Sequence, residues 1–98
     1  MNQKESIKEL MQIPSVGVSI ANDLYGIGIK KIKDLENKNP RRLYEKLNKT
    51  TGATHDVCVL YAFRCAVYFA SNKKHDKEKL KWWNWKNLTI NENKNYEH

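Results

Sequence analysis

The sequence Ile-Pro-Ser-Val-Gly at residues 13–17 decides how the first third of this 98-residue chain folds. Before it, three apolar residues have the spacing of one helix face: Ile7, Leu10 and Met11. Pro14 ends that helix, because proline lacks an N–H and disfavours a helical residue before it. Gly17 allows a turn that a side chain would block. Helical spacing then resumes, so the segment predicts a helix, a tight hairpin and a second helix.

The second helix is predicted from Ile20, Ala21 and Leu24, which share one face. Gly28 suits the left-handed conformation that ends a helix, and Ile29 follows as the apolar residue that packs back. The first N–H groups of such a helix have no helical partner and lie at the positive end of its dipole. A hairpin of this kind therefore suits a phosphate group.

This arrangement resembles the helix-hairpin-helix DNA-binding motif. The matching residues are Ile13, Pro14, Val16, Gly17, Ala21, Leu24, Gly28 and Ile29. The sequence departs from the motif at Ser15, where the first of two glycines usually stands. It departs again at Val18 and Ser19, where the motif has a proline and often a lysine.

The resemblance implies two sets of backbone contacts in the hairpin. The amides of Ser15, Gly17 and Ser19 would hold one DNA phosphate, in a turn that Pro14 and Val16 complete. A potassium or sodium ion would be held by backbone carbonyls, those of Met11, Ile13 and Val16. The alternative is a plain helical corner that packs against its neighbours and binds nothing.

The distribution of charge also favours nucleic acid as a partner. The net charge is +7, with net +5 in residues 30–49 and net +4 in residues 71–86. The hairpin segment itself is not basic, so electrostatic attraction has to come from its flanks. The candidates for additional phosphate contacts are Lys30, Lys31, Arg41 and Arg42. A solvated lysine-rich face is the commoner origin of such a charge pattern.

Several classes of protein fit the sequence poorly. The polar start predicts no signal peptide, and no apolar run is long enough to cross a membrane. Cys58 and Cys65 lie about 10 Å apart along one helix face, too far for a disulfide, so we expect buried thiols in the cytoplasm. No nucleophile, phosphate-loop or metal-ligand spacing is present, and we expect no enzyme and no cofactor beyond the hairpin ion.

The remaining sequence predicts an all-α bundle of five to six short helices. Asn2 and Asn39 are expected to cap the first and fourth helices, and Thr54 the fifth. Residues 57–70 are apolar except for Arg64, which predicts a central helix buried on most sides. A helix-hairpin-helix (SAM-like) N-terminal half would pack on this helix. We expect one domain over residues 1–86 and a polar, frayed tail over 87–98.

Arg64 and the tryptophans are the unusual residues of the C-terminal half. A buried guanidinium is costly without a partner, and we expect a structural role rather than a phosphate site. That role is an ion pair with Asp56 or Asp23, or a head group that reaches water past its apolar stem. Trp82, Trp83 and Trp85 predict packing on the central helix for at least two of the three. The alternatives for these rings are stacking on unpaired bases and anchoring a protein partner.

A second resemblance covers most of the chain, from about residue 10 to residue 85. Residues 56–68 read Asp-Val-Cys-Val-Leu-Tyr-Ala-Phe-Arg-Cys-Ala-Val-Tyr, and residues 81–85 read Lys-Trp-Trp-Asn-Trp. Together they resemble the small bacterial pathogenicity-locus family, some members of which are labelled mitomycin-resistance-like. The resemblance implies a helix-hairpin-helix domain in a bacterial cytoplasmic protein and leaves the molecular activity open.

The function that these observations favour is non-catalytic, sequence-independent binding of duplex DNA through the hairpin amides. The rival hypothesis is a protein-interaction module, in which the hairpin is a structural corner and the Trp82–Trp85 surface docks a partner or a second copy. Neither hypothesis involves a membrane.

Overall fold

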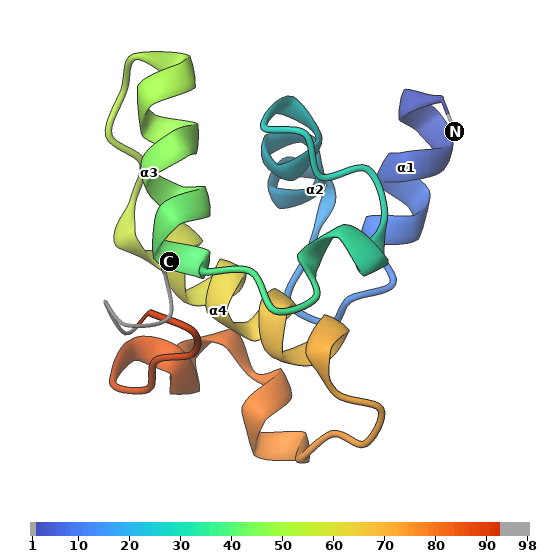
Figure 1. Ribbon diagram of the computed structural model, residues 1–98, viewed down its shortest axis with the longest axis vertical. Helices are drawn as coiled ribbons and strands as arrows, with labels where there is room; N and C mark the ends of the chain where they lie inside the picture. The colour runs from blue at the N-terminus through green and yellow to red at the C-terminus, as the bar shows by residue number, and fades with distance from the viewer. Residues whose placement is uncertain (1, 93–98) are drawn as a thin grey trace.

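The computed structural model describes residues 2–92, which form four α-helices and three short 3-10 helices without a strand (Figure 1). In chain order they are α1 (Gln3–Leu10), α2 (Val18–Gly26), η1 (Ile32–Leu35), α3 (Pro40–Thr51), α4 (Val57–Ser71), η2 (Lys77–Leu80) and η3 (Trp82–Lys86). The all-α class is confirmed. The expected third and last helices are 3-10 segments of four or five residues, since 3-10 helices occur mostly as short pieces.

Side-chain caps begin three of the four α-helices. The Asn2 and Asn39 side chains each accept from the amide three residues on, at 2.9 and 3.1 Å, as the sequence predicts. The expected cap at Thr54 is wrong, because Asp56 caps α4 by accepting from the Cys58 amide at 2.8 Å. Helix α4 begins only after His55, whose amide already donates to the side chain of Asn48.

Helix α4 is the central element, as its apolar sequence predicts. It packs against α3, η1, η2 and η3. Figure 1 shows α1, α2 and α3 on one side of α4 and the two C-terminal 3-10 helices on the other. The buried face of α4 includes Phe63, Ala66 and Val67, which join side chains of the α1–α2 pair in one core.

Glu92 is the partner of Arg64, in place of the expected Asp56 or Asp23. The Arg64 side chain is only 4% exposed and binds both carboxylate oxygens of Glu92, at 2.9 and 3.0 Å. Its third contact is the Trp85 carbonyl, at 2.9 Å. Arg64 therefore forms a structural ion pair with Glu92. Such a pair needs these extra hydrogen bonds to repay the loss of hydration.

The same contact changes the expected course of the C-terminal segment. Residues 87–92 return to the body of the protein, since Ile90 packs against the core and the Asn91 side chain donates to the Lys38 carbonyl at 3.1 Å. The packed chain thus extends past the expected boundary at residue 86, at least to Glu92. Residues 93–98 of the expected tail lie outside the described residues.

Two side chains expected in the core are exposed. Met11 follows the last residue of α1 and leaves the buried face, where Ser6 and Leu10 lie instead. Cys58 lies in the exposed first turn of α4, whereas Cys65 is buried as predicted. Both thiols are free.

Candidate nucleic-acid interface

The predicted hairpin is the turn between α1 and α2, residues 11–17. Its backbone is closed by two hydrogen bonds, from the Ile13 amide to the Leu10 carbonyl at 3.1 Å and from the Val16 amide to the Ile13 carbonyl at 2.9 Å. Ile13 and Val16 are buried in the core, while Pro14 and Gly17 face solvent. The apolar residues thus fix the turn from inside and leave its outer backbone accessible.

Ser15 has a role that the sequence comparison with the motif did not reveal. Its hydroxyl donates to the Ala62 carbonyl on α4 at 3.2 Å and so fastens the turn to the central helix. Burial raises the pKa of the neighbouring Cys65 thiol, and a hydrogen bond with the Ser15 hydroxyl lowers it in part. A serine in place of glycine therefore supplies an anchor. The partner lies 47 residues away, which is why no local pattern indicates it.

The start of α2 differs from the start of the other α-helices. Its N-cap is Gly17, which has no side chain to accept a hydrogen bond, whereas side chains cap the other three. Its first turn holds no acidic residue, as in α3 and α4. The first helical bond runs from the Ala21 amide to the Gly17 carbonyl at 2.9 Å. The amides of residues 17–20 are the orphan donors of this helix end. Two of the three predicted phosphate ligands, Gly17 and Ser19, belong to this set, and the third, Ser15, lies in the turn before it.

Gly17 is not required by the turn itself, contrary to our expectation. Its φ of −92° and ψ of −173° suit any residue. A Cβ placed on it would meet no atom within 4 Å. The absence of a side chain therefore leaves open space beside the orphan amides. By contrast, Gly28 has the predicted left-handed conformation, with φ +97°, and the Ile29 amide donates to the Leu24 carbonyl at 3.0 Å to end α2.

The predicted cation ligands are three carbonyls in and before this turn. The Ile13 carbonyl already accepts from the Val16 amide, which leaves it one lone pair for an ion. The other two predicted carbonyl ligands belong to Met11 and Val16. Among residues 2–92 no cluster of three or more His, Cys, Asp or Glu side chains is arranged to hold a metal. That finding concerns side chains and does not address backbone carbonyls.

Lys30 and Lys31 lie in the loop between α2 and η1. The Lys30 ammonium lies over the Tyr25 ring, 5.9 Å from its centroid. Both lysine amides donate to one carboxylate oxygen of Asp34, and the Ile32 amide donates to Glu9 on α1 at 2.8 Å. The loop is therefore fastened to α1, the helix that precedes the hairpin.

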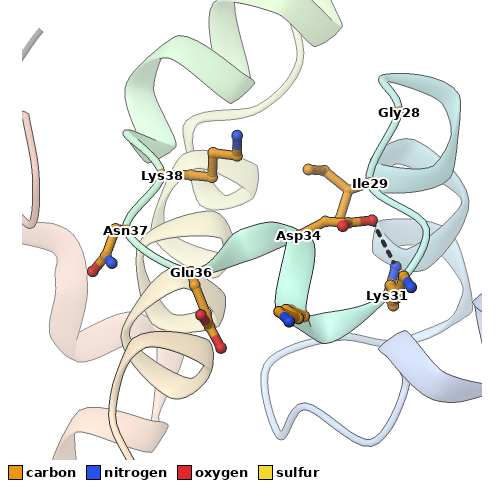
Figure 2. A pocket seen from close by; sticks show the side chains of 8 residues that line it. Gly28, Ile29, Lys31, Asp34, Glu36, Asn37 and Lys38 are labelled. Atoms are coloured by element: carbon orange, nitrogen blue, oxygen red, sulfur yellow. Dashed lines mark hydrogen bonds between the residues drawn. The ribbon is translucent and has the colours of Figure 1, made fainter.

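A shallow pocket of about 630 Å³ lies between this loop and the start of α3 (Figure 2). Its charged lining residues are Lys31, Lys33, Asp34, Glu36 and Lys38. Figure 2 shows the Asp34 carboxylate turned toward the Lys31 backbone. The lining mixes both signs of charge, so the pocket does not form a cationic site of its own.

Arg41 and Arg42 lie in the first turn of α3. The Arg41 guanidinium is about half exposed (52%) and is 3.4 Å from a carboxylate oxygen of Glu92. The Arg42 amide donates to the Asn39 cap. The arginines are thus on a different element from the hairpin, and Arg41 already has an acidic neighbour.

The tryptophan segment has one buried, one half-buried and one exposed ring. Trp85 is buried, and its indole N–H donates to the Lys79 carbonyl at 2.7 Å. Trp82 is half-buried, and Trp83 is 57% exposed. The prediction of packing on the central helix is confirmed for Trp85, whose ring centroid lies 5.5 Å from that of Tyr68 on α4, and stays a prediction for a second ring.

The comparisons with known proteins identify the family and nothing finer. The family model described as Cdd1, pathogenicity locus, matches residues 3–90. No curated protein and no solved structure matches the chain. The family match does not address the hairpin motif or the mitomycin-resistance label. Within residues 2–92, no helix is long and apolar enough to cross a membrane.

Proposed function

This chain belongs to the pathogenicity locus family, and we propose that it binds duplex DNA without sequence preference and without catalysis. In this proposal α1, the turn and α2 form a helix-hairpin-helix motif in a SAM-like domain. The amides of Ser15, Gly17 and Ser19 hold a backbone phosphate. Lys30, Lys31, Arg41 and Arg42 provide weaker contacts to neighbouring phosphates.

The observation that carries the proposal is the open start of α2. Its orphan amides have neither a side-chain cap nor an acidic neighbour in the first turn, and open space lies where the Gly17 side chain would be. Amides at the positive end of a helix dipole attract anions. The Ser15 anchor on α4 holds the turn in place, so little ordering is needed when a phosphate binds.

The proposal predicts weak, salt-sensitive binding. One hairpin and a few basic side chains neutralise about three or four phosphates. The logarithm of the binding constant then falls with the logarithm of salt concentration with a slope of about −3. The dissociation constant at physiological salt should lie at about 10⁻⁴–10⁻⁶ M, the range of non-specific binders. Fluorescence anisotropy of two labelled duplexes of unrelated sequence, titrated at several salt concentrations, measures both quantities.

Two aspartate variants on α2 separate the hairpin from general charge. Gly17→Asp places a carboxylate beside the orphan amides and should reduce affinity at least about tenfold by filling and repelling the phosphate site. Gly26→Asp makes the same change in net charge at the other end of the helix, where a Cβ also meets no atom within 4 Å. It should leave most of the affinity intact.

Thermal melts of both variants show whether the fold is retained. If folded Gly17→Asp and Gly26→Asp lost affinity equally, the loss would follow from net charge alone, and the hairpin would not be a specific phosphate site. No binding of wild-type protein at low salt would overturn the proposal.

We also propose that a potassium or sodium ion supports the turn through the carbonyls of Met11, Ile13 and Val16. Duplex affinity measured at equal ionic strength in potassium, sodium and choline chloride tests this, because choline is too large for such a site. Equal affinity in the three salts would exclude a contribution of the ion. Two free thiols among the described residues fit a cytoplasmic location, which we propose as well.

The second candidate function is a protein-interaction module. It is favoured by two exposed apolar side chains of the C-terminal segment, Trp83 and Leu88. In that case Gly17→Asp has no functional effect, and partner binding is lost when Trp83 is truncated.

A further inference from the structure

We propose that Trp83 is a stacking platform for an unpaired base, so that the preferred ligand is DNA in which a duplex adjoins a single strand. The inference rests on the proposed function for its duplex half, which the hairpin would hold. The new element is a second contact with DNA, made by the Trp83 ring, which the hairpin site does not use.

The 3-10 helix η3 presents Trp83 on a fixed support. On one side of it in sequence, Asn84 donates through its side chain to the Glu78 carbonyl at 2.7 Å, and Trp85 donates to the Lys79 carbonyl at 2.7 Å. Both acceptors belong to η2, so the two 3-10 helices brace each other. The backbone that carries Trp83 therefore needs little ordering when a ligand covers the ring.

The Trp83 ring is more open to solvent than the two neighbouring tryptophan rings. Trp83 is 57% exposed, the largest exposure of any tryptophan in the chain. Trp82 lies edge-to-face with it, with ring centroids 5.7 Å apart and an angle of 86° between the planes. Trp85 is buried against Tyr68, with centroids 5.5 Å apart. Trp85 therefore serves the fold, and Trp83, in edge contact with Trp82, keeps much of its surface available for a base.

The charge around Trp83 favours a polyanion over a protein as its occupant. Residues 71–86 hold six lysines and two acidic residues. Lys81 is 2.9 Å from Glu78, and both side chains are well exposed. A lysine-rich segment with an exposed aromatic ring has the composition of single-strand binding surfaces, where the cations follow the backbone and the ring stacks on bases of any sequence. Interfaces between proteins, by contrast, are depleted in lysine.

The platform and the hairpin are connected through a short path of contacts across α4. The Ser15 hydroxyl of the hairpin reaches the Ala62 carbonyl, one turn of α4 from Cys65. The Cys65 thiol donates to the Lys79 carbonyl at 3.4 Å, the same oxygen that accepts from Trp85. The hairpin and the η2–η3 pair thus contact the same turn of α4 from its two sides. A single-stranded extension of a duplex held at the hairpin would have to pass around α4 to reach Trp83.

The experiment compares three labelled ligands in anisotropy titrations: a blunt duplex, the same duplex with an eight-nucleotide overhang, and the overhang strand alone. The overhang should tighten binding at least about fivefold, since stacking of one base contributes about 1–3 kcal/mol. Trp83→Leu keeps an apolar side chain but removes the ring, and it should abolish this gain while blunt-duplex affinity stays the same. Trp83→Phe should retain part of the gain. Quenching of tryptophan emission by the overhang, lost in Trp83→Leu, reports the stacking directly.

Failure of this inference differs from failure of the hairpin proposal. If the overhang adds no affinity, or if Trp83→Leu weakens the blunt duplex as much as the overhang ligand, the platform is overturned and the hairpin remains. If Trp83→Leu abolishes binding of the single strand but Gly17→Asp changes no affinity, the hairpin is overturned and the platform remains. Loss of binding to an isolated protein partner in Trp83→Leu, without DNA binding by wild type, would overturn both.

Discussion

The two turns that join consecutive α-helices, residues 11–17 and residues 52–56, have opposite chemistry at the helix they begin. The α1–α2 turn ends at Gly17, which leaves the amides of α2 open. The α3–α4 turn ends at Asp56, whose carboxylate accepts from the first turn of α4. Two turns between α-helices therefore produce one helix start suited to an anion and one that carries an anion of its own.

The charge at the second turn is maintained by the helix it caps. Hydrogen bonds from the Cys58 amide and then from the Cys58 thiol lower the pKa of Asp56 below its ordinary 3.8. The same interaction raises the pKa of the exposed Cys58 thiol, which therefore stays protonated at neutral pH. A single residue at the N-cap thus decides whether a helix start attracts or repels a phosphate.

The two turns also differ in the number of side-chain hydrogen bonds that hold them. This difference gives the largest predicted effect on the free energy of unfolding. The second turn is held by Asn48, whose side-chain oxygen is 2.8 Å from the His55 amide and 2.7 Å from its ring, and by a bond from the Tyr44 hydroxyl to the His55 carbonyl. Asn48→Ala leaves the half-buried His55 amide without its acceptor and should cost about 1–3 kcal/mol of unfolding free energy. Ser15→Ala removes one bond from the first turn and should cost about 1 kcal/mol.

Urea denaturation of both variants measures the difference between the two turns. Asn48→Asp keeps an acceptor oxygen at the same position and is the control, so it should lose less stability than Asn48→Ala. A larger loss for Ser15→Ala than for Asn48→Ala would mean that the first turn is the more tightly held of the two.

The glycines of the two turns provide the next prediction. Gly52 ends α3 with φ +70°, so Gly52→Ala should destabilise the protein by about 1–2 kcal/mol without changing duplex affinity. Gly17→Ala should leave stability nearly unchanged, because a gain of about 0.4–1 kcal/mol from the stiffer unfolded chain is offset by the weaker cap. Its duplex affinity should fall, since the methyl group occupies the open space beside the amides. Thermal melts and anisotropy titrations of both variants test this crossed pattern. A duplex affinity unchanged by Gly17→Ala would place the phosphate elsewhere.

The sequence predicted the first turn better than the second, for reasons of distance along the chain. Pro14, the left-handed Gly28 and the Asn2 and Asn39 caps act within a few residues, and local rules identify them. The choice of Asp56 over Thr54 as a cap depended on Asn48 holding His55 outside the helix, a contact between residues seven apart. For the candidate site, the sequence indicated which backbone amides could bind a phosphate. It did not indicate the open space around them, because that space depends on the packed fold.

Long-range contacts explain the remaining differences. An ion pair was one of two structural roles expected for Arg64, but its partner Glu92 lies 28 residues away in a polar segment that looks unfolded by composition. The Ser15 anchor spans 47 residues. Periodicity and capping patterns describe single elements, whereas these contacts depend on which elements meet.

Removing the charge of Asp56 at the second turn should have a smaller effect, on the affinity for DNA. Asp56→Asn retains a good N-cap but loses the carboxylate. If the second turn approaches the duplex, low-salt affinity should rise about twofold, and the rise should vanish at high salt because it is electrostatic. Anisotropy at two salt concentrations measures it. Unchanged affinity at low salt would show that only the first turn faces the DNA.

The smallest effect is the pH dependence that Asp56 gives to folding. Its pKa is lower in the folded protein than its ordinary 3.8, so the unfolded chain binds more protons between the two values, and stability rises with pH across that interval. The contribution is fully present above the unfolded pKa and is lost as the pH falls through the folded one. Asp56→Asn does not titrate, so the stability difference between wild type and this variant should be constant above about pH 5 and should shrink below pH 4. Paired denaturation curves between pH 3 and pH 7 test this. A difference independent of pH would mean that the cap at α4 works equally well without its charge, and the contrast between the two turns would then concern DNA binding alone.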